Sequence, residues 1–235
     1  VGRGAVFSAL AGLAVVLAAW TVRLDPIPPD APSIAAVGRA LRDSRFVAGL
    51  GLMALPSLLS GLLSTLAPLR LAAAGWGAAG IGGVWLVTAG FETGLSPLAG
   101  RLLDRRGVWL PVQLALAAAA PASVGLALGP RPLAYVPLVV LAGGAYGVLF
   151  TPAFAMIAEG AERSSLPQGM AFGLMNAAWA MGALVGPAVG GAVAAAAGDV
   201  VPFVVAAGFC ATALVAVRRA RHRTATRVAP SDVAG

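Results

Sequence analysis

The sequence predicts an all-α integral membrane protein, a helical bundle of about seven transmembrane helices. Apolar residues make up 59% of the 235 residues and charged residues only 11%, whereas a soluble domain carries about 25% charged residues. The apolar residues form blocks near the ~20 residues that a helix needs to cross ~30 Å of hydrocarbon. These blocks lack the two-residue alternation of membrane strands. The predicted spans are residues 4–22, 46–67, 77–100, 108–128, 132–157, 168–196 and 200–217.

The positive charge lies mostly on one side of these spans. All sixteen basic residues are arginines, and the net charge is +7. If Arg101 faces the cytoplasm, alternation of the spans places only Arg3, Arg70 and Arg131 on the outer side, as the positive-inside rule predicts. This distribution explains the charge without a nucleic-acid partner, since no basic groove with interleaved aromatic residues is visible. The arginines on the cytoplasmic side are Arg23, Arg39, Arg42, Arg45, Arg101, Arg105, Arg106, Arg163, Arg218, Arg219, Arg221, Arg223 and Arg227.

The order of elements suggests a single span followed by a larger unit. The first span, residues 4–22, precedes the longest polar segment, a cytoplasmic linker over residues 23–45. A compact six-span unit, residues 46–217, follows with short connections. The basic tail, residues 218–235, is expected to lie near anionic lipid on the cytoplasmic side.

The linker contains two different parts. Its first half is rich in proline, which lacks a backbone donor and restricts the preceding residue, so regular helix is excluded there. Ser33 then caps a short amphipathic helix with Ile34, Val37 and Leu41 on one face. We expect this helix to lie on the inner membrane surface.

A charged turn separates the spans 77–100 and 108–128. Its run Gly-Arg-Leu-Leu-Asp-Arg-Arg-Gly covers residues 100–107, and charge packed between two membrane-length helices marks a short loop at one bilayer face. The run resembles the cytoplasmic loop signature of the major facilitator superfamily of secondary transporters, although Val108 stands where that family usually has a basic residue. A simple positive-inside loop with a turn glycine is the alternative interpretation. The matching residues are Gly100, Asp104, Arg105 and Gly107.

A second pattern lies in the span 168–196. Glycines at i, i+4 and i+8 form one flat helix face that a neighbouring backbone can approach, and a proline there can bend the helix. The spacing resembles a pattern associated with antiporters of this superfamily, particularly drug/proton exporters. Generic packing in a glycine-rich chain is the alternative. The residues concerned are Gly173, Gly182, Gly186, Pro187, Gly190 and Gly191.

The resemblance implies a C-terminal half of a twelve-helix major facilitator fold. The fourth span of an N-terminal half usually carries an arginine, whereas residues 138–152 contain no charge. In this frame residues 1–22 correspond to span six and residues 46–217 to spans seven to twelve, as two three-helix repeats. A missing N-terminal half or a partner chain would supply the other spans.

Glu92 is the only acidic residue well inside a predicted span. It lies twelve residues before Asp104, about 18 Å along a helix, and therefore near mid-bilayer. Carboxyl groups at that depth are costly and tend to face a functional cavity. We expect Glu92, with Asn176 of the span 168–196, to form a proton or substrate site. The alternative is a neutral Glu92 that packs between helices and bonds to Thr88 or Ser96.

No enzymatic site is predicted. The sequence shows no cluster of metal ligands, no nucleophile with a base and no phosphate-binding loop, so we expect neither metal nor cofactor. The family resemblance implies transport of a small molecule by alternating access, with protons as the coupling ion and efflux of drugs or other organic solutes. An importer of sugars or organic acids, or a non-transporting half-size scaffold, is the alternative. The expected location is the inner (plasma) membrane, with the linker and tail cytoplasmic.

Overall fold

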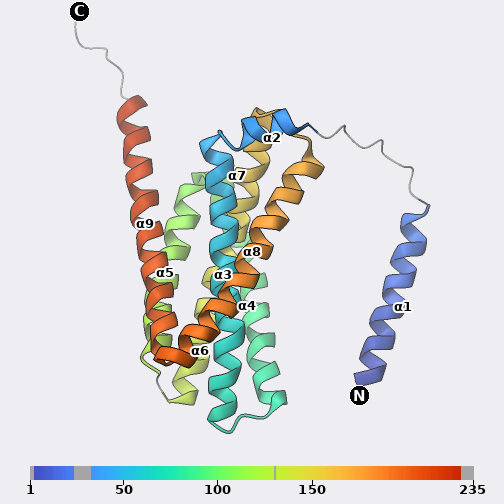
Figure 1. Ribbon diagram of the computed structural model, residues 1–235, viewed down its shortest axis with the longest axis vertical. Coiled ribbons are helices and arrows are strands. Elements are labelled where there is room, and N and C mark those ends of the chain that lie inside the picture. Colours follow the sequence, from blue (N-terminus) through green and yellow to red (C-terminus); the bar gives the residue numbers. More distant parts are fainter. Residues whose placement is uncertain (1–2, 24–32, 130, 229–235) are drawn as a thin grey trace, which may run out of the picture. The chain divides into compact units, whose positions relative to one another are not determined.

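The computed structural model describes residues 3–23, 33–129 and 131–228, and within these ranges every regular element is a helix (Figure 1). The chain divides into two compact units, Val1–Ala31 and Pro32–Gly235. The first unit contains α1 (Arg3–Thr21), whose residues 4–21 are all exposed. The second contains α2 (Ile34–Ala40), α3 (Ser44–Ala73), α4 (Ala78–Arg106), α5 (Trp109–Ala127), α6 (Pro132–Val148), α7 (Phe150–Arg163), α8 (Gln168–Ala197) and α9 (Val200–Val228).

The helices correspond closely to the predicted membrane spans. Within the described residues, six stretches are long and apolar enough to cross a bilayer, and they coincide with six of the predicted spans. The predicted span 77–100 is also helical, as part of the 29-residue α4, but glycines, threonines and Glu92 dilute its apolar character. The apolar stretches are Gly4–Thr21, Ser44–Ala73, Trp109–Ala127, Pro132–Arg163, Gln168–Ala197 and Val200–Arg219.

Three helix pairs of the second unit relate its two halves; α3 also packs against α7, and α5 against α6. α3 packs along α8, α5 along α9, and α4 along α6; Figure 1 shows α5 and α9 side by side. Counted as one span, α6 and α7 form a second set of three with α8 and α9, beside the first set α3, α4 and α5. If α3 is matched to α6, α4 to α8 and α5 to α9, the α3–α8 pair corresponds to the α4–α6 pair. This pairing has the symmetry expected of two three-helix repeats.

The predicted span 132–157 is interrupted by a break at Leu149. The N–H of Leu149 bonds to the carbonyl of Tyr146 at 3.2 Å, three residues back, and α7 begins at Phe150. Proline at 152 lacks the N–H that would bond to the carbonyl of Val148, so a continuous α-helical ladder cannot form there. The break lies beside the candidate site described below.

The short helix α2 lies where the sequence predicts one. The Ser33 hydroxyl oxygen accepts the N–H of Ala36 at 3.2 Å, the expected capping bond. Small side chains make the packing contacts: Ala36 and Ala40 are buried with residues of α7 and α8. Ile34 is 88% exposed. Of the predicted apolar face, Val37 therefore packs against the bundle, whereas Ile34 and Leu41 are exposed.

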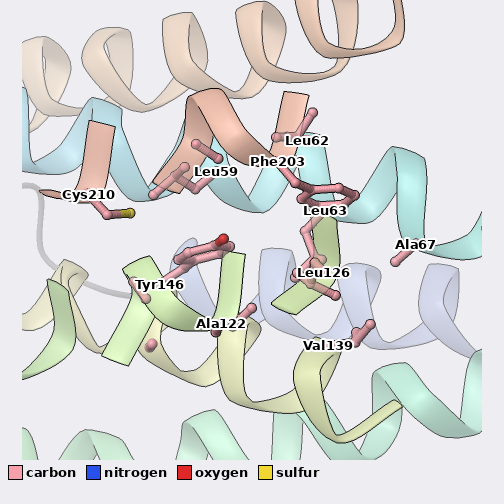
Figure 2. Packing of buried hydrophobic residues seen from close by; sticks show 14 of the residues in the cluster. Leu59, Leu62, Leu63, Ala67, Ala122, Leu126, Val139, Tyr146, Phe203 and Cys210 are labelled. Atoms are coloured by element: carbon pink, nitrogen blue, oxygen red, sulfur yellow. The ribbon is translucent and has the colours of Figure 1, made fainter. Parts of the chain in front are cut away.

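A large apolar core joins α3, α5, α6 and α9. Figure 2 shows side chains of Leu63, Tyr146 and Phe203 converging on the interior from three of these helices. The hydroxyls of Tyr146 and Ser123 lie 2.6 Å apart, so both buried groups are satisfied. At its far end α9 continues to Val228, and the described part of the predicted tail is therefore helical.

Candidate functional site

A half-open cavity of about 420 Å³ lies between α3, α4, α6, α7 and α8. Serines of α3 and tryptophans of α4 and α8 line it, and Glu92 of α4 is the single charged residue among the lining residues. None of the lining residues comes from α5 or α9. The lining comprises Ser57, Ser60, Gly61, Leu63, Ser64, Trp85, Thr88, Ala89, Glu92, Gly143, Phe150, Trp179, Ala183 and Pro187.

Glu92 lies midway along α4, fourteen residues from each of its ends, which is about 21 Å at 1.5 Å per residue. Its side chain is half-buried and lies over the Cα atom of Gly147 on α6. The carboxylate is in neither a hydrogen bond nor an ion pair with any described residue. Glu92 is at the same time one of the residues that line the cavity.

The hydroxyl groups on either side of Glu92 are engaged elsewhere. Thr88 donates to the carbonyl of Val84 at 2.8 Å, and Ser96 donates to the backbone carbonyl of Glu92 at 2.9 Å. Hydroxyls often bond back to their own helix in this way. The alternative expectation, a carboxyl group held by Thr88 or Ser96, does not match this geometry.

Three serines of α3 contribute hydroxyl groups to the cavity lining. Ser57, Ser60 and Ser64 recur at helical spacing, so the three hydroxyls lie on one face. Ser57 donates to the backbone carbonyl of Trp179 at 2.6 Å and thereby ties α3 to α8. The sequence analysis missed these serines, although their spacing within an apolar span was a usable signal.

Asn176 does not join this cavity. It lies on α8 and is exposed, and it is not among the lining residues. Trp179, one turn further along, occupies the cavity wall instead. The structure therefore does not bring together the two residues that we expected to share a site.

The glycines of α8 behave in two different ways. Gly182, Gly186 and Gly190 face α3, where the nearest atoms belong to Ala54, Leu58 and Leu62. Pro187 in turn packs against Gly61 of α3. A side chain at Gly173 or Gly191 would meet nothing within 4 Å, so these two glycines make no close approach to any described part of the chain.

The charged turn between α4 and α5 projects outward. Gly107 ends α4 at φ +76°, a conformation that favours glycine, and donates its N–H to Leu103 at 2.8 Å. A side chain at Gly100 would meet nothing within 4 Å. Asp104 and Arg105 are exposed and take part in none of the ion pairs within the described ranges.

Ion pairs join the start of α3 to the end of α7. Asp43 caps α3 by accepting the N–H groups of Arg45 and Phe46 at 2.9 Å each, and its carboxylate also lies 2.9 Å from Arg163. The bond from the Phe46 N–H, with the help of Arg163, holds the pKa of Asp43 below its usual value. Glu159 pairs with both Arg45 and Arg163. This network fixes the bundle at the end where α2 lies.

The sequence profile described as Major Facilitator Superfamily matches residues 4–167, which run from α1 through α7. The chain belongs to the major facilitator superfamily. None of the curated proteins matches the chain in sequence. The helices described above are therefore a portion of the major facilitator fold, and the protein is a multi-pass membrane protein.

Membership also establishes the general class of activity. Major facilitator proteins are transporters of small molecules and not enzymes. Substrate sites of such transporters lie near the bilayer midplane between repeats. The cavity beside Glu92 is therefore the candidate site for a solute. Its lining residues come from α3, α4, α6, α7 and α8.

Proposed function

We propose that this major facilitator protein is a proton-coupled exporter of drugs or other small organic molecules. The observation that carries the proposal is Glu92, a carboxyl group halfway along a membrane-length helix, facing a cavity and without a partner among the described residues. An isolated carboxylate is costly at such a depth. The group is therefore suited to release its proton when a positively charged solute binds beside it.

The cavity lining supports an organic cation as the exchanged solute. Trp85 and Trp179 present indole rings, which attract cations through the faces of their π-systems. The serine hydroxyls of α3 add hydrogen-bonding capacity without charge. A proton and a cation that compete for one carboxylate give antiport directly, because Glu92 cannot hold both at once.

We further propose that the described bundle forms the C-terminal half of the transporter. In this assignment α1 corresponds to span six, residues 23–45 to the cytoplasmic linker, residues 46–217 to the six-helix half and residues 218–235 to a cytoplasmic tail. The division of the chain between Ala31 and Pro32, inside the linker, supports the assignment. A preceding segment or partner chain would form the opposite wall of the cavity, and rocking of the two halves would give alternating access.

The exposed turn at Gly100, Asp104, Arg105 and Gly107 fits this arrangement. Its charges are turned away from the bundle, so we assign them to a contact with the other half on the cytoplasmic side. The arginine distribution supports a cytoplasmic position for this turn. The plasma membrane, which is the inner membrane of a cell with two membranes, is the proposed location.

Inside-out vesicles from cells that express the protein in its native assembly test the proposal. With an acid interior, a proton-coupled exporter accumulates the cation ethidium, and a protonophore releases it. Proton-driven release of preloaded labelled sugars or organic acids, without ethidium transport, would favour an importer. The absence of any solute flux above that of vesicles lacking the protein would contradict a transport function and favour a scaffold.

A further inference from the structure

Three glycines of α6 receive side chains of α4. Thr88 lies against Gly143, Phe91 against Gly144, and Glu92 against Gly147. A Cβ atom at any of the three positions would overlap the facing side chain. The α4–α6 pair is therefore close because α6 has no side chains along this strip.

Gly147 differs from its two neighbours in what it faces. The atoms that approach it are Cγ, Cδ and Oε1 of Glu92, which are the carboxyl group and the carbon before it. Gly143 faces a methyl group of Thr88, and Gly144 faces the ring of Phe91. A methyl group at Gly147 would thus displace the carboxyl group itself.

The carboxyl group of Glu92 can move in one direction only, toward the cavity. On the α6 side the carboxyl group is blocked by the backbone of Gly147, whereas the cavity lies on its other side. The end of a glutamate is flexible, so the bundle can accept the added methyl group if the carboxyl swings into the cavity. An alanine at this position would therefore move the charged group while leaving the helices in place.

We propose that Gly147 is a positioning residue for Glu92, and that the missing side chain at Gly147 sets where the carboxyl group meets protons and solute. The inference rests on the proposed role of Glu92 in coupling. Gly147 itself touches no solute in this account. It acts by letting the carboxyl group lie against α6, in the last turn before the break at Leu149.

A double-mutant cycle tests the inference. Ethidium transport is measured in inside-out vesicles for the wild type, Gly147→Ala, Glu92→Asp and the double variant, both under a pH gradient and as counterflow without one. Gly147→Ala is expected to lower gradient-driven uptake about tenfold and counterflow much less. Aspartate is one methylene shorter and places fewer atoms against Gly147, so the alanine is expected to cost less in the Glu92→Asp background than in the wild type.

Gly144→Ala is the matched control, because it crowds the same helix pair at Phe91 and not at Glu92. It is expected to lower the amount of folded protein without changing the ratio of gradient-driven uptake to counterflow. Equal losses from Gly147→Ala in the wild-type and Glu92→Asp backgrounds would overturn the inference. The same ratio change in Gly144→Ala would also overturn it.

A second measurement needs no transported solute. Labelling of Glu92 by a water-soluble carbodiimide at pH 5, quantified by mass spectrometry, is expected to rise several-fold in Gly147→Ala, because the carboxyl group moves into the cavity. Unchanged labelling in folded protein contradicts the inference. If Glu92→Gln keeps full gradient-driven uptake, the proposed function fails; if that variant loses uptake while the cycle is additive, only the role of Gly147 fails.

Discussion

Gly186 of α8 lies against the backbone carbonyl of Leu58 on α3, with no room between them for a side chain. A neighbouring glycine, Gly182, lies in the same way against the carbonyl of Ala54. Backbone atoms cannot rotate out of the way as the end of a side chain can. The α3–α8 contact therefore depends on glycine more strictly than the α4–α6 contact does.

Replacement of Gly186 by alanine is expected to destabilise the protein by about 1–3 kcal/mol, because the helices must separate to admit a methyl group. Gly191→Ala is the control on the same helix, since its Cβ atom meets nothing within 4 Å. Thermal unfolding in detergent measures both. Equal midpoints for the two variants would show that the α3–α8 approach is not tight.

A second prediction concerns Arg70, at the end of the bundle opposite α2. Its Nε atom donates to Asp199 at 3.1 Å, and a second nitrogen donates to the carbonyl of Leu126. The guanidinium group also lies 5.6 Å from the ring centre of Tyr135 and 5.4 Å from that of Phe203. Arg70 thus joins α3 to α5, α6, α9 and the turn between α8 and α9.

Arg70→Ala is expected to cost about 2 kcal/mol of stability, because it leaves the Leu126 carbonyl and Asp199 without these bonds and removes both ring contacts. Arg70→Lys recovers only part of the loss, since a single ammonium group cannot reproduce the planar fork. Arg131 is exposed and is in none of the ion pairs of the described residues, so Arg131→Ala is the charge-matched control. Thermal unfolding of the three variants checks the prediction, and a loss in Arg131→Ala equal to that in Arg70→Ala would refute it.

Acid is expected to weaken the contact between Asp43 and Arg163. The pKa of Asp43 is held below its usual value in the folded protein, so the carboxylate contributes stability above that usual value, and the contribution disappears as the pH falls through the lowered pKa. The unfolding midpoint of the wild type should therefore fall below about pH 4 more steeply than that of Asp43→Asn. The asparagine keeps a capping oxygen but not the charge. Parallel pH curves for the two proteins would contradict this assignment.

Local sequence signals predicted much of the fold. Long apolar runs predicted the helices, and Ser33 before an amphipathic run predicted α2 together with its cap. Glycine spacing predicted that Gly182, Gly186 and Gly190 share one face. These features are set within one helix, so no knowledge of its neighbours was needed.

The candidate site was less predictable because it depends on how helices are rotated against one another. Glu92 stood out as an acid in an apolar run, but nothing in the sequence indicates that it lies over Gly147, one of 31 glycines. The expectation for Asn176 was wrong for the same reason. A polar residue in the middle of a span does not reveal which neighbour it faces, and on α8 it is Trp179 that lines the cavity.

The central claim is that Glu92 couples solute movement to protons, and Glu92→Gln tests it most directly. In inside-out vesicles carrying the native assembly, this variant should lose ethidium uptake driven by a pH gradient, because the amide cannot exchange a proton. Glu162→Gln, the same change at an exposed residue of α7, should keep this uptake. Gradient-driven uptake by Glu92→Gln equal to that of the wild type would contradict the account.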